Sequence, residues 1–355
     1  METMPYSVFS EHLFSKAAEQ KKPLRGQIEL TYRCNVRCVH CYTDCFNNPE
    51  DIQKEMDTGS ILRLVDEMQG AGCLWLCLTG GEIFMRRDFF QIYDYCLAKG
   101  FILTLFTNAT MITEEIADRL AAHPPFSIET SCHGVGEVFD RVVQVPGSFR
   151  KFDEGIRRLL KRELPVQIKT KAMTLNRNHL NEIEDYVTRL GLEFSFSTAI
   201  HPDLKGSEKT THYRLTPQEI AELEMEGGVD EEEGCRGSDD SFQKPSETLY
   251  RCGCGTNTFL MGAHGWMASC VFGRQIEKKW DPGQFQERVQ ALFEETRSLK
   301  FKGVSPCRRC MITLFCDKKP GVLALQGKNP EDPDRYFCET AHAKAAKVGF
   351  KIKSP

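Results

Sequence analysis

The chain has 355 residues and a net formal charge of −4, with 41% hydrophobic and 27% charged residues, as in ordinary globular proteins. Its length suits two domains, or one large domain with an appendage. No apolar run approaches the roughly 20 residues of a membrane helix, the N-terminal residues lack a signal-peptide pattern, and the charge gives no reason to expect nucleic acid. We therefore expect a cytoplasmic protein without a membrane or nucleic-acid partner.

From residue 27 to about residue 202, short β-like runs alternate with helix-like runs. The expected strands are Gln27–Tyr32, Leu74–Leu78, Phe101–Phe106, Phe126–Ser131, Val166–Met173 and Glu193–Thr198. The expected helices are Gly59–Gln69, Asp88–Ala98, Glu114–Ala121, Phe149–Lys161 and His179–Leu190. Such alternation favours parallel strands with right-handed crossovers. Six strands are fewer than the eight of a closed barrel, so we predict an α/β fold, a partial (β/α)6 TIM-like barrel with its site at the carboxyl ends of the strands.

The pattern changes after Pro202. Thr216-Pro217-Gln218-Glu219 predicts a helix start, with Thr as the cap, Pro first and Glu third. The stretch Glu224–Asp240 is rich in Gly, Asp and Glu and predicts a linker. From Arg251 onward, Gly, Cys and Pro are frequent and periodic segments are few, which is typical of a small unit organised by metal. We predict an extension (1–26), a barrel (27–223), a linker (224–250), a small Cys-rich metal-binding domain (251–345) and a basic tail (346–355).

The 16 cysteines are grouped rather than spread. Four lie between Cys34 and Cys45, and eight lie between Cys235 and Cys338. A reducing cytosol keeps thiols free, and clustered free thiols there most often hold metal. The segment Cys34-Asn-Val-Arg-Cys38-Val-His-Cys41 follows the first expected strand, where three thiolates can converge on three irons of a four-iron cluster. The alternative is a zinc site with His40 or Cys45 as its fourth ligand.

The segment Cys34–Cys41 resembles the cysteine motif of the radical S-adenosylmethionine (SAM) superfamily, and three later strand ends are also similar to elements of that family. The second strand ends in Gly80–Glu82, which resembles the Gly-Gly-Glu element, although Ile83 stands where the family usually has Pro. The third ends in Thr107-Asn108, and the fourth reads Glu129–Gly134, close to the family's Glu-x-Ser-x-His-Gly. These elements fall in the expected order across roughly residues 27–202.

The resemblance implies a four-iron cluster on Cys34, Cys38 and Cys41 that binds S-adenosyl-L-methionine and cleaves it reductively to a 5′-deoxyadenosyl radical. That radical abstracts hydrogen from the substrate, and the protein positions the reactants and excludes water. The same resemblance places four elements on SAM: His40 near the adenine, Gly80, Gly81 and Glu82 near the methionine amine, and Asn108 and Ser131 near the ribose. The alternatives are a turn cap for Asn108 and a backbone hydrogen bond for Ser131.

The C-terminal spacing Cys252-x12-Gly265-x4-Cys270, then Cys307-x2-Cys310-x5-Cys316 and Cys338, resembles the SPASM domain, which holds two auxiliary four-iron clusters. The resemblance assigns Cys307, Cys310, Cys316 and Cys338 to the outer cluster, and Cys252 and Cys270 to the inner one. The alternative is a zinc-ribbon-like knot at the Cys-x2-Cys pair.

The inner ligand set departs from the family, because Pro320 stands where another Cys is expected. Cys254 or Cys235 could replace that ligand, one iron could stay open, or the cluster could be lost. We favour Cys254, because a Cys-x-Cys pair in an extended chain points its thiols to the same side. The expected cofactors are SAM, one radical SAM 4Fe-4S cluster, and one or two auxiliary clusters.

Enzymes with this pair of domains mostly modify peptides or proteins. We predict a ribosomal peptide (RiPP) maturase that forms a thioether or carbon–carbon cross-link, and Ser195–Lys209 resembles the sixth-strand region of that branch. The alternatives are a sulfatase-maturase-like enzyme, a tetrapyrrole-modifying enzyme, and a non-catalytic iron–sulfur or zinc protein.

The expected partners are a peptide or protein substrate and a flavodoxin- or ferredoxin-type electron donor. Only about 26 residues precede the first strand, too few for an N-terminal peptide-recognition domain. A separate leader-recognition protein is therefore a further candidate partner. The sequence assigns no catalytic base, because Glu129, His133, Lys169 and Lys171 are each equally compatible with a cofactor contact or a structural polar role.

Overall fold

The structure is a computed structural model that describes residues 5–43, 47, 49–226 and 247–350. The chain divides into two compact units. Unit 1 comprises residues 1–35, 46–106 and 253–299, and unit 2 comprises residues 36–45, 107–252 and 300–355. This division follows different lines from the five parts predicted above, which stay a prediction. Cys45, Cys235, most of the predicted linker and residues 351–355 lie outside the described residues.

The described residues of unit 1 form six strands in the order β3-β2-β1-β7-β8-β9. They are β1 (Arg25–Thr31), β2 (Trp75–Gly80), β3 (Ile102–Thr107), β7 (Thr258–Met261), β8 (Trp266–Ala268) and β9 (Lys278–Lys279). The strands β1, β2, β3 and β7 pair in parallel, and β8 and β9 add antiparallel pairs. The Cys-rich segment thus contributes three strands to this sheet. The sequence did not indicate them, because runs of two to four residues show no period.

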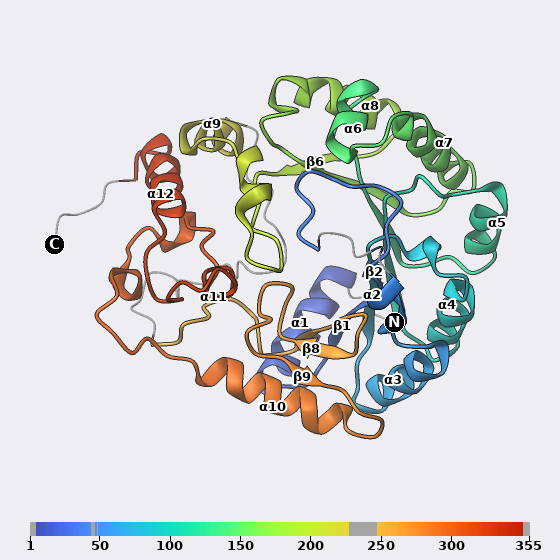
Figure 1. Ribbon diagram of the computed structural model, residues 1–355, viewed down its shortest axis with the longest axis horizontal. Helices are drawn as coiled ribbons and strands as arrows, with labels where there is room; N and C mark the ends of the chain where they lie inside the picture. The colour runs from blue at the N-terminus through green and yellow to red at the C-terminus, as the bar shows by residue number, and fades with distance from the viewer. Residues whose placement is uncertain (1–4, 44–46, 48, 227–246, 351–355) are drawn as a thin grey trace. The chain divides into compact units, whose positions relative to one another are not determined.

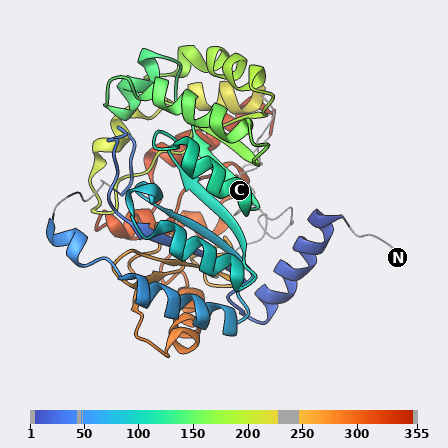
Figure 2. The same cartoon turned by 90° about the vertical axis from the view of Figure 1, so that its right-hand side faces the viewer.

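The helices of unit 1 are α1 (Tyr6–Glu19), α2 (Pro49–Gln53), α3 (Thr58–Gly70), α4 (Phe89–Ala98) and α10 (Phe285–Ser298), with the 3-10 turn η1 (Ile83–Met85). The helix α3 buries Ile61, Leu64, Val65 and Met68, a helical stripe that explains its accurate prediction. Figure 1 shows α10, in orange, beside β8 and β9, and Figure 2 gives its packing against α3 from the side. We did not predict α1, which stacks Phe14 on Trp75.

Unit 2 contains the parallel strands β4 (Ser127–Ser131), β5 (Val166–Lys171) and β6 (Phe194–Ser197). Its helices are α5 (Glu114–Ala122), α6 (Glu137–Val143), α7 (Ser148–Leu160), α8 (Leu180–Arg189), α9 (Pro217–Glu226), α11 (Pro320–Leu325) and α12 (Arg335–Lys347). Its 3-10 turns are η2 (Arg177–His179), η3 (Glu208–Tyr213), η5 (Pro306–Arg309) and η6 (Thr313–Phe315). The α/β alternation and the six barrel strands, β1–β6, are confirmed.

The helix start predicted at Thr216 is confirmed. Its backbone N–H donates to the Glu219 carboxylate at 2.7 Å, and the N–H of Glu219 donates back to the Thr216 hydroxyl at 3.3 Å. This reciprocal pair is a capping box at the start of α9. Among the described residues, no helix is long and apolar enough to cross a membrane.

Candidate functional site

The end of β2 lies against the segment that follows β1 in unit 1. The N–H of Gly81 donates to the carbonyl of Thr31 at 2.8 Å, and the N–H of Glu82 donates to the carbonyl of Arg33 at 2.8 Å. A Cβ atom at Gly80 would lie 2.2 Å from the Thr31 carbonyl oxygen, and one at Gly81 would lie 2.2 Å from that of Arg33. Gly80 also has a φ of +143°. Only glycine fits this approach of two backbones.

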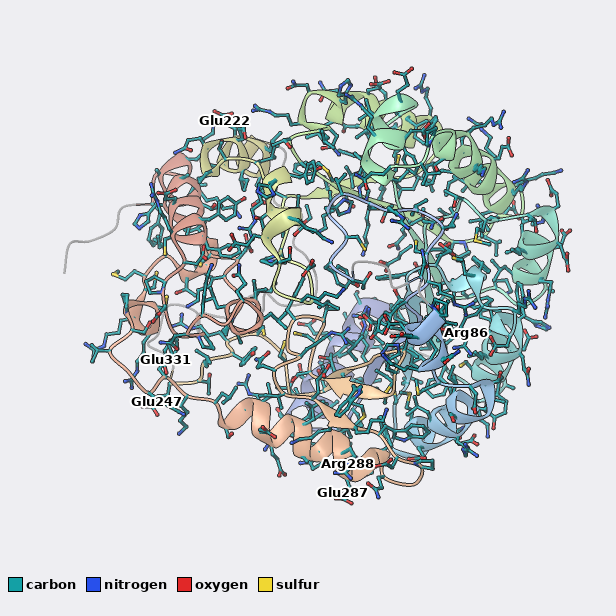
Figure 3. The ribbon with its side chains drawn as sticks, in the orientation of Figure 1. Arg86, Glu222, Glu247, Glu287, Arg288 and Glu331 are labelled. Carbon is teal, nitrogen blue, oxygen red and sulfur yellow. The ribbon has the colours of Figure 1, made fainter. Side chains whose placement is uncertain are left out.

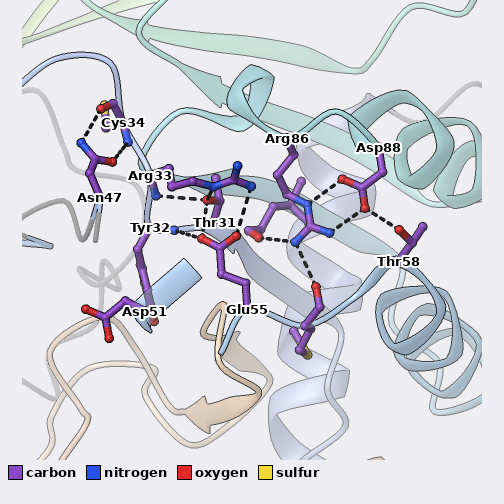
Figure 4. Close-up of polar contacts among 12 residues, drawn as sticks. Thr31, Tyr32, Arg33, Cys34, Asn47, Asp51, Glu55, Thr58, Arg86 and Asp88 are labelled. Carbon is purple, nitrogen blue, oxygen red and sulfur yellow. Dashed lines mark hydrogen bonds and ion pairs between the residues drawn. The ribbon is translucent and has the colours of Figure 1, made fainter. Parts of the chain in front are cut away.

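The first cysteine of the motif is fixed by the side chain of Asn47. Asn47 accepts a hydrogen bond from the Cys34 N–H at 3.0 Å and donates to the Cys34 carbonyl at 2.9 Å, as Figure 4 shows. Just after β2, the buried Glu82 carboxylate accepts a hydrogen bond from the Phe84 N–H and caps η1. The sequence pointed to Cys34 and Glu82 but not to Asn47, because an amide thirteen residues away carries no spacing signal.

A second network holds the residues between β1 and Cys34. Glu55 accepts hydrogen bonds from the Thr31 hydroxyl at 2.5 Å and the Tyr32 N–H at 3.0 Å (Figure 4). It also forms an ion pair with Arg33 at 3.2 Å. The loop that presents the first thiol is therefore fixed by charge and by backbone pairing.

Arg86, labelled in Figures 3 and 4, directly follows η1 and links three segments of unit 1. Its guanidinium donates to the carbonyls of Leu30 at 2.8 Å and Met56 at 3.1 Å. It also pairs with Asp88 at 2.6 Å. Hydrogen bonds from Arg86 and Thr58 hold the pKa of Asp88 down at about 2. The end of β1 is thus linked to the start of α4.

The rest of the motif, from Val36 on, belongs to unit 2. The N–H of Val39 donates to the carbonyl of Val142 at 2.9 Å, which ties the loop to the end of α6. The N–H of Cys41 donates to the carbonyl of Cys38 at 3.0 Å, and the Cys41 Sγ lies 3.1 Å from the Thr43 hydroxyl. The loop is a turn with its two thiols half-buried.

His40 packs edge-on against His133, with ring centroids 4.5 Å apart. The N–H of Lys171 donates to Nδ1 of His133 at 3.0 Å. The Nδ1 atom of His40 is enclosed, and it has no hydrogen-bond partner within the part of the chain that the structure describes. Burial, with a smaller contribution from the Lys171 cation, lowers the pKa of His40 to about 4. Its ring is therefore neutral at neutral pH and offers an enclosed nitrogen to a ligand.

Polar side chains gather at the carboxyl ends of the strands in unit 2. Asn108 accepts from the N–H and hydroxyl of Thr110 at 3.0 and 2.6 Å, which is the turn-cap arrangement considered above. Ser131 is exposed at the end of β4. Beside it, Lys169 on β5 forms an ion pair with Glu129 at 2.6 Å. These side chains lie at strand ends, as predicted, but their ligand roles stay predictions.

Four C-terminal cysteines come together in unit 2. Cys307 lies on η5, Cys310 and Cys316 follow η5 and η6, and Cys338 lies on α12. Burial raises the pKa of Cys316 to about 11, and Asp317, Cys338 and Cys310 add to that shift. The pKa of Cys338 is raised by burial and then by Cys307 and Cys310. Thiols that perturb one another in this way lie close together, although 22 residues separate the last two in sequence.

Two cationic side chains, Arg251 and Lys318, lie beside this cysteine group. Arg251 donates to the carbonyls of Cys307 at 3.1 Å and Arg308 at 2.9 Å, and to the hydroxyl of Thr313 at 2.8 Å. The ammonium group of Lys318 lies 3.5 Å from the Cys307 Sγ. Glu331, labelled in Figure 3, fixes the preceding loop by accepting from the N–H groups of residues 302 and 303. Cysteine spacing alone did not indicate these supporting side chains.

The remaining predicted ligands are distributed over both units. Cys252 belongs to unit 2, while Cys254 and Cys270 belong to unit 1. Cys254 is buried and pairs with Thr258 through an isolated bridge. Pro320 begins α11. Within the described ranges, no three Cys, His, Asp or Glu side chains converge on a single ion. A four-iron cluster, however, spaces its thiolates more widely than one ion does.

The chain is similar to several known proteins. Residues 28–190 match the family model of the Radical SAM superfamily. The AdoMet-dependent heme synthase of Methanosarcina barkeri is 34% identical over 156 residues, which are 44% of this chain and 43% of that protein. The mycofactocin maturase MftC of Mycobacterium tuberculosis is 25% identical over 341 residues, covering 90% of this chain and 83% of the maturase.

Two solved structures share the fold. Streptococcus suis SuiB bound to its precursor peptide SuiA matches with a TM-score of 0.63 at 15% identity, over 95% of this chain and 82% of SuiB. anSMEcpe with bound AdoMet and a peptide matches with a TM-score of 0.68 at 16% identity, over 92% of this chain and 97% of that one. These likenesses confirm the predicted partial-barrel fold class. The superfamily match of residues 28–190, across the cysteine motif and the strand ends, identifies this part of the chain as a radical SAM enzyme domain.

Proposed function

We propose that the chain modifies a peptide substrate, and that Cys34, Cys38 and Cys41 hold the four-iron cluster that binds SAM. Membership of the superfamily implies both this cluster and SAM. When bound, they supply a 5′-deoxyadenosyl radical that takes a hydrogen atom from the substrate. Three thiols at x3 and x2 spacing suit such a cluster, because they leave one iron for SAM. The contact of Asn47 with Cys34 supports this role, since its two hydrogen bonds hold the backbone that carries the first thiol.

The Gly80–Glu82 turn is proposed to receive the methionine amine of SAM. Glu82 is fully buried, and a buried carboxylate is a strong acceptor for an ammonium group. The turn is held by its hydrogen bonds to Thr31 and Arg33, so that the acceptor is positioned before SAM arrives. Such pre-organisation lowers the entropy lost on binding.

His40, Asn108 and Ser131 are proposed to contact the nucleoside part of SAM. The enclosed Nδ1 of His40, neutral at neutral pH, suits acceptance of a hydrogen bond from the adenine amino group. The Oδ1 atom of Asn108 serves its own turn, so its amide NH₂ group is the part assigned to the ribose. The exposed hydroxyl of Ser131 is the second ribose contact.

The outer cysteine group is proposed to hold an auxiliary four-iron cluster on Cys307, Cys310, Cys316 and Cys338. The mutual perturbation of these thiols and their gathering within one unit support this assignment. Such a cluster supplies a one-electron acceptor. Cys252, Cys254 and Cys270 are proposed as ligands of an inner cluster, in which Cys254 replaces the cysteine ligand that is missing at Pro320.

A peptide is the proposed substrate because the match to a peptide maturase extends over most of the chain. MftC matches across 90% of this chain, whereas the heme synthase matches across 44%. SuiB and anSMEcpe each have a solved structure with a bound peptide. The higher identity to the heme synthase, 34%, makes a tetrapyrrole the second candidate substrate. A flavodoxin- or ferredoxin-type donor and a leader-recognition protein are the proposed partners.

The test is anaerobic turnover of the iron-loaded protein with SAM and a reductant. Candidate substrates are precursor peptides encoded near its gene and, in parallel, iron coproporphyrin. We expect 5′-deoxyadenosine formation to rise with one peptide, and the mass of that peptide to change. Consumption of the porphyrin, with no peptide changed, would replace the proposed function by the tetrapyrrole alternative.

A further inference from the structure

Lys318 contacts the outer cysteine group through both its backbone and its side chain. Its ammonium group donates to the Cys307 Sγ at 3.5 Å. Its backbone N–H lowers the pKa of the Cys316 thiol and its positive charge lowers that of Cys338, in each case against the larger upward shift from burial. One residue thus acts on three of the four thiols.

The side chain of Lys318 donates its hydrogen bond to the Cys307 sulfur. In the described part of the chain, its ammonium group makes no other hydrogen bond and no ion pair. The charge of Lys318 helps to lower the pKa of Glu331, but that carboxylate accepts its hydrogen bonds from backbone N–H groups. Lys344, by contrast, is neutralised by two carboxylates. The half-buried Lys318 therefore presents its positive charge to Cys307.

The reduction potential of a four-iron cluster depends on hydrogen bonds to its sulfur ligands, on nearby charge and on solvent exposure. A positive charge stabilises the reduced state, which carries one more electron, and so raises the potential. The other charged groups at this site partly cancel. Arg251 adds positive charge near three of the cysteines, while Asp317 and Asp334 add negative charge beside Cys316 and Cys338.

We propose that Lys318 is a positioning residue that raises the reduction potential of a cluster on Cys307, Cys310, Cys316 and Cys338 by donating to the Cys307 sulfur. This inference rests on the proposed auxiliary cluster. Its consequence is functional, because a higher reduction potential makes this cluster a better acceptor of the electron that the substrate loses as it is oxidised.

The test measures the potential directly. A variant with Ala at Cys34, Cys38 and Cys41 removes the motif's cluster from the spectra. In that background, the outer cluster is identified as the paramagnetic resonance signal that Cys307→Ala abolishes. Its potential is then titrated with dithionite in Lys318→Met, Lys318→Gln and Lys318→Arg. The control is Lys302→Met, an exposed lysine that also lies near Glu331.

We expect Lys318→Met to keep its iron but to lower the ratio of reduced to oxidised cluster at least tenfold at a fixed potential, or 59 mV for a one-electron couple. Lys318→Gln should fall between, and Lys318→Arg and Lys302→Met should match the parent. If Lys318→Met loses its cluster, the reduction potentials of Lys318→Gln and Lys318→Arg are compared instead.

Three results would overturn the inference. An intact cluster with unchanged potential in Lys318→Met and Lys318→Gln would remove the role of Lys318 and leave the proposed cluster standing. Loss of the cluster in both variants, with retention in Lys318→Arg, would make the role purely structural. Absence of any signal sensitive to Cys307→Ala would remove the auxiliary cluster itself, and the inference with it.

Discussion

Lys344 provides a test of how unit 2 is held around the outer cysteine group. Its side chain on α12 is only 2% exposed, and its ammonium group lies 2.6 Å from Glu224 on α9 and 2.9 Å from Asp317. Asp317 follows Cys316 directly, and Cys338 lies on the same helix as Lys344. One cation therefore joins α9, α12 and the cysteine loop.

Replacing Lys344 by Met keeps most of its volume but leaves two carboxylates without their cation. Removing one partner of a buried ion pair costs about 3–5 kcal/mol, and we expect that loss in the free energy of unfolding of Lys344→Met. The assay is urea unfolding of the metal-free protein, followed by circular dichroism, so that no cluster is needed for the measurement.

Arg335→Met is the matched control, because Arg335 forms an ion pair with Glu339 on the same helix but its side chain is 91% exposed. Exposed pairs contribute about 0–1 kcal/mol, so this variant should lose less than 1 kcal/mol. Adding Glu224→Gln and Asp317→Asn to Lys344→Met should recover stability, since no buried charge then lacks a partner. A loss below 1 kcal/mol in Lys344→Met would refute the assignment of a buried ionic clamp.

Three further predictions concern the site. Gly81→Ala should lose about 2 kcal/mol of stability, because its Cβ would displace two backbone hydrogen bonds of about 1 kcal/mol each. The same variant should yield little 5′-deoxyadenosine. The control is Gly70→Ala, whose Cβ would meet no atom within 4 Å and which should match the parent protein in both assays. Asp88, with a pKa of about 2, should contribute about 1–2 kcal/mol above pH 4 and lose it between pH 4 and 2; urea midpoints of Asp88→Asn that decline with acid as steeply as those of the parent would contradict this. Cys307→Ala or Cys338→Ala should leave substrate-free SAM cleavage intact but abolish product, and normal product from a variant shown to lack the outer cluster would refute that division of roles.

The fold was predictable where a period or a short motif carries it. The strands β1–β6 and the helices α3, α4, α5, α7 and α8 show clear periodicity, and their observed bounds lie within a few residues of the predicted ones. The glycines at the end of β2 were identified by family resemblance, and the structure supplies the physical reason, a backbone approach that no side chain permits.

What the sequence missed depends on contacts between distant residues. Asn47 reaches back thirteen residues to Cys34, and β7 pairs with β1 from more than two hundred residues away. Lys344 reads as a surface residue in the sequence, but on α12 its side chain lies in the core beside two carboxylates. Lys318 has no motif, and its role follows only from its distance to a sulfur.

The proposed function depends on a cluster, held by the segment Cys34–Cys41, that cleaves SAM. The most direct test is the amount of 5′-deoxyadenosine formed by iron-loaded, reduced protein with SAM and no substrate, compared with a variant that has Ala at Cys34, Cys38 and Cys41. We predict slow but definite formation by the parent protein and none by the variant. No 5′-deoxyadenosine from intact, iron-loaded parent protein, or equal amounts from the two proteins, would contradict it.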